Sequence, residues 1–178
     1  MFTDLGKITE PYNIELKQDE KKFVVYELWR VPIPLLPKVK EQLKEMEQDH
    51  VIAPVEQPTE WCAGMVVVPK KGSSQVRICV DLTKLNESVK REKLQLPSVD
   101  ETLAQLGGAT VFSKLDAASS FWQVPLTEES SLLTTFMTPI GRYRFLRLPY
   151  GINSSSKHFQ RQMSNILQGD RKSTRLNS

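Results

Sequence analysis

The sequence predicts a fold of the α+β class. Its hydrophobic patterns follow the order helix, hairpin, helix, strand, hairpin, helix, which differs from the regular strand-helix alternation of α/β proteins. No G-x-G-x-x-G motif follows a predicted strand, which argues against a dinucleotide-binding fold. A length of 178 residues suits one ordinary domain or a part of a larger one.

Residues 1–37 form the first predicted unit, an extended connecting segment. Three prolines in its last eight residues, RVPIPLLP, are incompatible with a helix or a central strand. From Lys38 the pattern changes to KVKEQLKEMEQDHVI, in which Val39, Leu43 and Met46 recur at three- and four-residue spacing between charged residues. This spacing predicts an amphipathic helix that buries those three side chains.

A β-hairpin is predicted next, in MVVVPKKGSSQVRICVDL. Two β-branched runs flank a loop of lysine, glycine and serine, which is a typical hairpin pattern. In the second run Val76, Ile78 and Val80 should point to one face of the sheet, while Arg77 and Cys79 point to the other.

The remaining elements follow in order. Residues 98–108, SVDETLAQLGG, combine a capping box of Ser98 and Glu101 with a final glycine pair, and so predict a helix. TVFSKLD predicts a buried strand that ends at Asp116, and LLTTFMTPIGRYRFLRLPYG predicts a second hairpin that turns at residues 139–141. SSKHFQRQMSNIL predicts a last helix whose apolar face consists of Phe159, Met163, Ile166 and Leu167.

Charge, cysteine content and hydropathy exclude several functional classes. A net charge of +3 is too small to indicate nucleic-acid binding by itself. Cys62 and Cys79 form no C-x-x-C pair and predict reduced, half-buried thiols, and no zinc-ligand spacing occurs. No apolar run approaches the roughly 20 residues of a membrane span, and the N-terminus lacks the pattern of a signal peptide. We therefore expect no membrane contact and no secretion.

The last nine residues, DRKSTRLNS at positions 170–178, differ in pattern from the preceding sequence. They are the translation of GATCGGAAGAGCACACGTCTGAACTCC, the start of a widely used sequencing-library adapter. We interpret them as an artefact of a reading frame that ran into adapter sequence, and exclude them from the fold prediction. The alternative is an ordinary polar C-terminal tail.

Asp116 is the first candidate site residue, because a charged carboxylate at the end of a buried strand is costly unless something compensates it. A divalent metal would compensate it, but so would a salt bridge or an N-cap on the following turn. Residues 117–120, AASS, have small side chains that let backbone N–H groups approach an anionic ligand such as a phosphate. Phe121 could then form a wall against a sugar, or belong to the core.

Basic residues on the two hairpins are the other candidates. Lys70, Lys71 and Arg77 could hold a triphosphate together, although a lysine-rich hairpin tip is commonly only a solvated turn. The second hairpin alternates aromatic residues with a basic ribbon suited to a phosphate backbone or to the wet face of a sheet, namely Arg142, Arg144 and Arg147.

Three segments together carry a resemblance to a known family: VVVPKKGSSQVRICVDLTKLN, QLPSVDETLAQLGGATVFSKLDAASSFWQVPL and TTFMTPIGRYRFLRLPYGINSSSKHFQRQM. In order and spacing they closely resemble the fingers and early palm motifs of reverse transcriptases, RNA-directed DNA polymerases, from gypsy-like LTR retrotransposons. The resemblance spans residues 30–167. It implies the fingers and an incomplete palm of a right-hand polymerase fold over residues 38–169, preceded by the linker segment of a polyprotein.

The resemblance also implies a role for each matching position. Asp116 matches the first catalytic aspartate, a ligand of the Mg²⁺ ions that bind the incoming nucleotide. Lys70 and Arg77 match the fingertip residues that hold the triphosphate, and Phe121 matches the aromatic steric gate under the sugar 2′ position. The other positions assigned by resemblance to the nucleotide-binding site are Ala117, Tyr150 and Gly151.

Two departures from the family pattern affect the expected activity. Residues 154–158, SSSKH, stand where the family has a small residue followed by Ala-Pro, which suggests divergence or decay. The sequence also contains no Tyr-x-Asp-Asp tetrapeptide, from which the family takes two metal-binding carboxylates. We therefore expect the 178-residue chain by itself to be inactive.

The sequence thus supports two hypotheses. In the first, the chain is a fragment of a retrotransposon enzyme that copies RNA or DNA templates into DNA by two-metal nucleotidyl transfer. Its partners would be a template with primer and deoxynucleoside triphosphates, with RNase H and integrase regions downstream in a cytoplasmic, element-encoded particle. In the second, the chain is a decayed or domesticated remnant that only binds nucleic acid.

Overall fold

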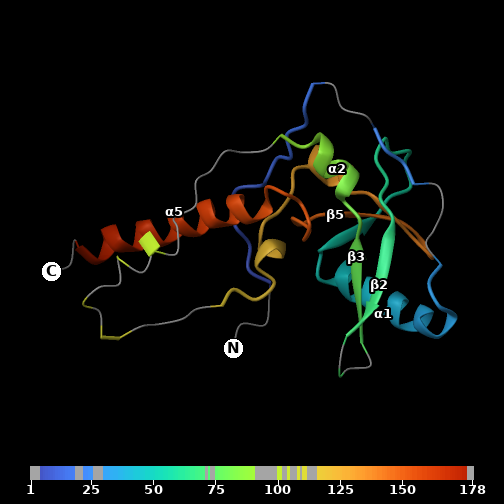
Figure 1. Ribbon diagram of the computed structural model, residues 1–178, viewed down its shortest axis with the longest axis horizontal. Coiled ribbons are helices and arrows are strands. Elements are labelled where there is room, and N and C mark those ends of the chain that lie inside the picture. Colours follow the sequence, from blue (N-terminus) through green and yellow to red (C-terminus); the bar gives the residue numbers. More distant parts are fainter. Residues whose placement is uncertain are drawn as a thin grey trace.

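A computed structural model describes residues 5–18, 22–25, 30–70, 72, 75–90, 100–101, 104, 108, 110–111 and 116–175, with side chains described as far as Leu167. Two antiparallel sheets and several helices make up these residues (Figure 1), which confirms the predicted α+β class. A single hydrophobic cluster includes residues from both sheets, from helix α1 and from the N-terminal segment.

Helix α1 (Leu36–Gln48) follows a short 3-10 turn, η1 (Ile33–Leu35), and buries Val39, Leu43 and Met46 as predicted. The pattern had suggested a start at Lys38 and a run to Ile52, but the helix is displaced at both ends. Pro37 fits in its first turn, where a missing N–H costs no hydrogen bond.

The C-terminus of α1 is set by His50, whose φ of 53° leaves the helical region. The His50 N–H then donates to the Glu47 carbonyl at 3.0 Å, and the Val51 N–H donates to the Met46 carbonyl at 2.9 Å. This is the Schellman arrangement, which satisfies two carbonyls of the last turn and turns the chain into a strand.

The first predicted hairpin is confirmed. Strand β2 (Met65–Pro69) pairs with strand β3 (Val76–Val80), with Met65 opposite Val80 and Pro69 opposite Val76. Val76 is buried whereas Arg77 and Cys79 are exposed, as the alternation predicts. The prediction of two half-buried thiols was wrong: Cys62 is buried, and Cys79 is exposed because it lies on the outward face of β3.

The second hairpin is also confirmed, and it belongs to a three-stranded sheet. Strand β4 (Phe136–Thr138) and strand β5 (Gly141–Phe145) are joined by a tight turn between Thr138 and Gly141. Strand β1 (Ile52–Pro54), which was not predicted, pairs with the other edge of β5, so that the order is β1-β5-β4.

The segment before α1 has the irregular course expected of it, but it packs against the body of the protein. Ile8, Tyr12 and Ile14 are buried in the common core. The Ile8 N–H donates to the Gln123 carbonyl, and the Tyr12 N–H donates to the Pro125 carbonyl, both at 2.8 Å. The domain boundary between residues 37 and 38 stays a prediction.

Besides η1 and β1, three short elements were not predicted: helix α2 (Thr83–Ser88), the 3-10 helix η2 (Ser120–Gln123) and helix α4 (Glu128–Leu133). Each is too short for an apolar period to emerge. Helix α4 has a recognisable start, because the Thr127 side chain accepts from the Ser130 N–H and Glu128 and Glu129 occupy the first turn.

Helix α5 (Ser155–Arg175) begins where a last helix was predicted, but its buried face differs. His158 and Gln162 are buried, Phe159 and Met163 are partly buried, and Ile166 and Leu167 are 52% and 54% exposed. The helix extends away from the two sheets toward its C-terminus (Figure 1). The helix continues into positions 170–175, whose interpretation as adapter translation stays a prediction.

The remaining predictions are covered only in part. Asp100, Glu101 and Ala104 are helical, as expected for residues 98–108, but most of that segment lies outside the described residues. Of the predicted buried strand before Asp116, Thr110 and Val111 are described: neither is in a strand and both are exposed, Val111 to 85%, so the prediction was wrong there. Within the described residues, no helix is long and apolar enough to cross a membrane.

Candidate nucleotide-binding cleft

A cleft of about 740 Å³ lies between the first hairpin, helix α1 and the chain on either side of β5. Its size is in the range of small-molecule sites. Two cations, three aromatic rings and a glycine line it: Lys70, Arg77, Trp122, Phe145, Tyr150 and Gly151. None of the described lining residues is acidic, so the cleft presents positive charge to an anionic ligand.

The hairpin places Lys70 and Arg77 at this cleft. Strand pairing sets Arg77 opposite Val68, two residues before Lys70. Gln75 holds Lys70 twice, since its backbone carbonyl accepts from the Lys70 N–H and its Oε1 accepts from Nζ, both at 3.0 Å. The structure therefore brings these two predicted residues together, whereas Lys71 lies outside the described residues.

Tyr150 and Gly151 line the cleft from a loop at residues 149–153, which connects the β5 hairpin to α5. Tyr150 is 52% exposed, while the preceding Pro149 is fully buried and anchors the loop. Gly151 has a φ of 97°, a conformation that glycine adopts at little cost and other residues rarely adopt.

Phe121 lies behind Tyr150. Its ring centroid is 5.0 Å from that of Tyr150 and 5.9 Å from that of Phe159, and it is not among the residues that line the cleft. The neighbouring Ser119 and Trp122 line it instead. The steric-gate assignment of Phe121 stays a prediction, and in this structure the ring supports Tyr150.

Asp116 and Ala117 are both exposed and do not belong to the cleft lining. The argument that burial makes the Asp116 carboxylate costly was therefore wrong, because water solvates it. An exposed carboxylate oxygen is a suitable ligand for Mg²⁺. However, the described residues contain no group of three metal-ligating side chains, so they do not form a complete Mg²⁺ site.

The basic ribbon of the second hairpin is largely occupied within the protein. Arg142 Nη2 donates to the carbonyls of Glu56 and Gln57 at 3.1 and 3.0 Å, and Arg144 pairs with Glu128. Arg147 is half-buried. Arg142 and Arg144 therefore bind groups within the protein, and the interpretation of a free row of cations for a phosphate backbone is not supported.

Two residues that sequence reasoning missed contribute to the cleft. Trp122 lines it and packs edge-to-face against Tyr150, with ring centroids 6.0 Å apart. Asn86 on α2 contacts the 149–153 loop through both atoms of its amide. The Trp122 pairing could have been suspected from the aromatic pair at 121–122, but no local pattern indicates a contact across 65 residues.

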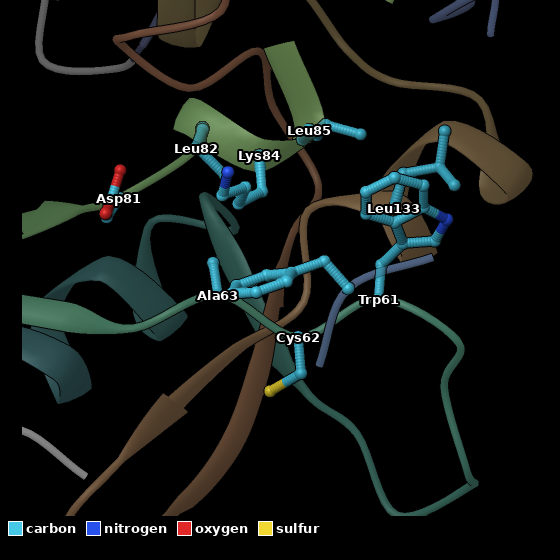
Figure 2. A pocket seen from close by; sticks show the side chains of 9 residues that line it. Trp61, Cys62, Ala63, Asp81, Leu82, Lys84, Leu85 and Leu133 are labelled. Carbon is cyan, nitrogen blue, oxygen red and sulfur yellow. The ribbon is translucent and has the colours of Figure 1, made fainter. Parts of the chain in front are cut away.

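A second cavity, of about 10 Å³, lies between α2, α4 and the chain before β2. Figure 2 shows Leu82, Lys84 and Leu85 on one side of it, with Trp61, Cys62 and Ala63 on the other. Burial raises the pKa of the Cys62 thiol, partly offset by Arg142, so the thiol stays neutral. This space is about that of one water molecule, so we do not consider it a ligand site.

Curated relatives resemble the chain over most of its length. The Pol polyprotein of transposon 412 from Drosophila melanogaster is 32% identical over 161 residues, which cover 88% of this chain and 13% of that protein. The Pol polyprotein of the Drosophila transposon gypsy is 34% identical over 134 residues, or 72% of this chain and 13% of that protein. The chain therefore spans about an eighth of the length of these relatives.

Solved structures support the same fold. A foamy virus protease-reverse transcriptase matches with a TM-score of 0.74 and 22% identity, over 92% of this chain and 21% of that one. A foamy viral protease-reverse transcriptase in complex with double-stranded DNA matches with a TM-score of 0.69 and 17% identity, over 92% of this chain and 28% of that one. These likenesses confirm the right-hand polymerase fold.

The family model described as "Reverse transcriptase (RNA-dependent DNA polymerase)" matches residues 68–177, more than half of the chain. The matched range starts within the first hairpin and includes all the cleft residues except those of α1. The chain belongs to the reverse transcriptase family.

Proposed function

We propose that this chain is the nucleotide-binding part of a polymerase domain that copies RNA or DNA templates into DNA. The observation that carries the proposal is the cleft, which combines Lys70 and Arg77 with Tyr150 and Gly151 and has no acidic residue among its described lining. Two cations on one hairpin suit a triphosphate, with the lysine as a mobile point charge and the arginine as a planar fork. A template with primer would be the second partner.

The remaining site residues take their proposed roles from the family. Ala117 leaves room for a nucleotide beside its backbone N–H, and Phe121 limits the space under the sugar 2′ position. In this structure Phe121 would act through Tyr150, because the two rings are in contact. Tyr150 and Gly151 would form the wall of the pocket beside the base and sugar.

Asp116 is the residue proposed to hold Mg²⁺. When bound in the complete enzyme, the ions would lower the barrier to attack by a primer 3′-hydroxyl on the incoming nucleotide. Asp116 supplies one hard oxygen ligand for this purpose. The other carboxylates of such a site are not found in the described part of this chain, nor does the sequence contain the Tyr-x-Asp-Asp motif.

The proposal therefore separates binding from chemistry. The purified chain should bind mant-dATP, a fluorescent deoxynucleotide, and should extend no primer on an RNA template even with Mg²⁺ present. Changing Lys70 and Arg77 together to alanine should raise the Kd for mant-dATP by about tenfold or more, because charge-assisted contacts to phosphate are lost.

The matched control is Lys40→Ala, which removes an exposed cation from α1 that does not line the cleft. This variant should bind mant-dATP as the unmodified chain does. Equal binding by the double alanine variant would contradict the assignment of the cleft. Measurable Mg²⁺-dependent primer extension would contradict the inactivity of the chain.

The serines at 154–156 are the departure from the family pattern that suggested a decayed remnant. The structure accommodates the first two: Tyr12 donates its hydroxyl to Ser154 Oγ at 2.6 Å, and Ser155 Oγ donates to the Pro149 carbonyl at 3.4 Å. Both serines are buried. Because both are integrated into the packing, we favour divergence over decay at this position.

A further inference from the structure

The 149–153 loop is anchored at both ends by ordinary contacts. The Leu148 N–H donates to the Val124 carbonyl at 2.8 Å before the loop, and the Ser155 N–H donates to the Ile152 carbonyl at 3.1 Å after it. Between these anchors the chain presents Tyr150 and Gly151 to the cleft. Tyr150 is exposed and a glycine leaves the backbone at 151 free to adopt other conformations, so a contact from another element would restrict the middle of the loop.

Asn86 supplies that support from helix α2. Its Nδ2 donates to the Gly151 carbonyl at 2.7 Å, and its Oδ1 accepts from the Asn153 N–H at 2.9 Å. The helix itself is fixed, because its Leu85 and Ser88 are buried. One short side chain thus connects the element after the first hairpin to the loop that forms the opposite wall of the cleft.

The chemistry of this contact is specific to an amide. The loop offers a carbonyl and an N–H, so its partner must donate to one and accept from the other at the same time. An aspartate has no hydrogen to donate and would place a carboxylate against the Gly151 carbonyl. An alanine would leave both loop groups without this partner.

We propose that Asn86 is a positioning residue for the nucleotide cleft: its amide holds the 149–153 loop so that Tyr150 and Gly151 keep the shape that binds the nucleotide. The inference rests on the proposed nucleotide-binding function. A preorganised wall avoids the ordering cost that a mobile loop would add to binding. Asn86 acts through the loop and does not itself line the cleft.

The test compares Asn86→Ala and Asn86→Asp with two controls. Val39→Ala removes a fully buried side chain from α1 and lowers stability without touching the loop. Glu87→Gln changes the neighbouring residue on α2, whose carboxylate pairs with Lys84 and with no other described residue. For each variant we would measure the hydrogen-exchange rate of the Asn153 backbone N–H and the Kd for mant-dATP, both well below the melting temperature of the variant.

Both Asn86 variants should exchange the Asn153 amide faster and raise the Kd about tenfold, the size expected when one preorganising contact is lost. Both controls should leave the Asn153 exchange rate and the Kd unchanged. Because Val39→Ala is also less stable, this result separates a positioning role of Asn86 from a general loss of stability. Unchanged exchange at Asn153, or faster exchange with an unchanged Kd, would overturn the proposal. If the unmodified chain binds no mant-dATP, the proposed function fails, and the exchange rate alone decides whether Asn86 holds the loop.

Discussion

The cleft wall and the Asp116 segment are both proposed to serve the same reaction, yet this chain holds them differently. The 149–153 loop is bonded at its ends and through Asn86 in its middle, and its Pro149 is fully buried. Asp116 is exposed, and no described residue forms a hydrogen bond or ion pair with its carboxylate.

This difference between the 149–153 loop and Asp116 follows from the role proposed for each. A wall that recognises a nucleotide can be completed by contacts between neighbouring elements of one chain. A carboxylate that ligates a metal has to stay free of internal cations, because an ion pair would compete with the metal for its oxygens. Asp116 thus has the unpaired state that the proposed role requires, but it needs further carboxylates to form a site.

The largest expected effect is on the free energy of unfolding, and it contrasts the packed core beside the cleft with the exposed Asp116. Phe136 is fully buried in β4, and its ring centroid is 5.1 Å from that of Phe145, which lines the cleft. Phe136→Ala should lower the free energy of unfolding by about 3–5 kcal/mol, the usual cost of deleting a buried ring. Asp116→Ala should change it by less than about 0.5 kcal/mol, because the side chain is exposed and no described residue bonds to its carboxylate.

Urea denaturation followed by circular dichroism measures both values. If Asp116→Ala destabilised the chain by as much as Phe136→Ala, the carboxylate would have a structural partner and the contrast between the two regions would disappear.

A smaller effect is expected at the centre of the loop. Gly151→Ala should cost about 1–2 kcal/mol, since a side chain at φ 97° is strained. The cost is one of backbone conformation rather than packing, because nothing lies within 4 Å of the Cβ that alanine would add. The variant should also bind mant-dATP more weakly, as measured by fluorescence titration.

Gly108→Ala is the matched control, with a similar φ of 82°, equally open space and no place in the cleft lining. It should lose comparable stability and keep its nucleotide affinity. Equal affinity in both variants would show that the loop conformation does not shape the site.

The elements predicted from sequence were those defined by local patterns. Helix α1 and both hairpins follow from apolar spacing and turn residues, and Val39, Leu43 and Met46 are buried as that spacing requires. The ends of α1 were misplaced because its stop depends on a left-handed His50, where glycine is the usual residue.

The other errors concern burial and side-chain partners, which depend on the rest of the molecule. Ile166 has the correct spacing for a buried face of α5, but its side chain is 52% exposed. The helix extends away from the two sheets toward its C-terminus (Figure 1). Arg142 was correctly placed on β5, yet its spacing could not show that backbone carbonyls of residues 56 and 57 would take up its donors.

For the site, sequence reasoning found the cations and the glycine but not their support. Lys70, Arg77, Tyr150 and Gly151 line one cleft, and their roles in nucleotide binding stay predictions. Asn86 was missed because its two contacts join residues that are distant in sequence, and an asparagine in a short helix carries no pattern that announces them.

The smallest expected effect concerns helix α2, which carries Asn86. Hydrogen bonds from Thr83 hold the pKa of the Asp81 carboxyl below its ordinary value of 3.8, and Oδ1 accepts from the Thr83 N–H at 3.1 Å at the start of this helix. A lowered pKa in the folded chain means that the carboxylate adds stability above pH 3.8 and loses that contribution as the pH falls through the folded-state pKa.

Because Asp81 is exposed, solvent screening limits the effect to about 0.5 kcal/mol or less. Asp81→Asn should therefore be slightly less stable than the unmodified chain at pH 7, and the difference in urea midpoints should vanish as the pH falls below the folded-state pKa of Asp81. If the difference in urea midpoints between the two proteins instead grew on acidification, the folded chain would favour the protonated Asp81 carboxyl, and the bond from the Thr83 N–H would not be what stabilises the start of α2.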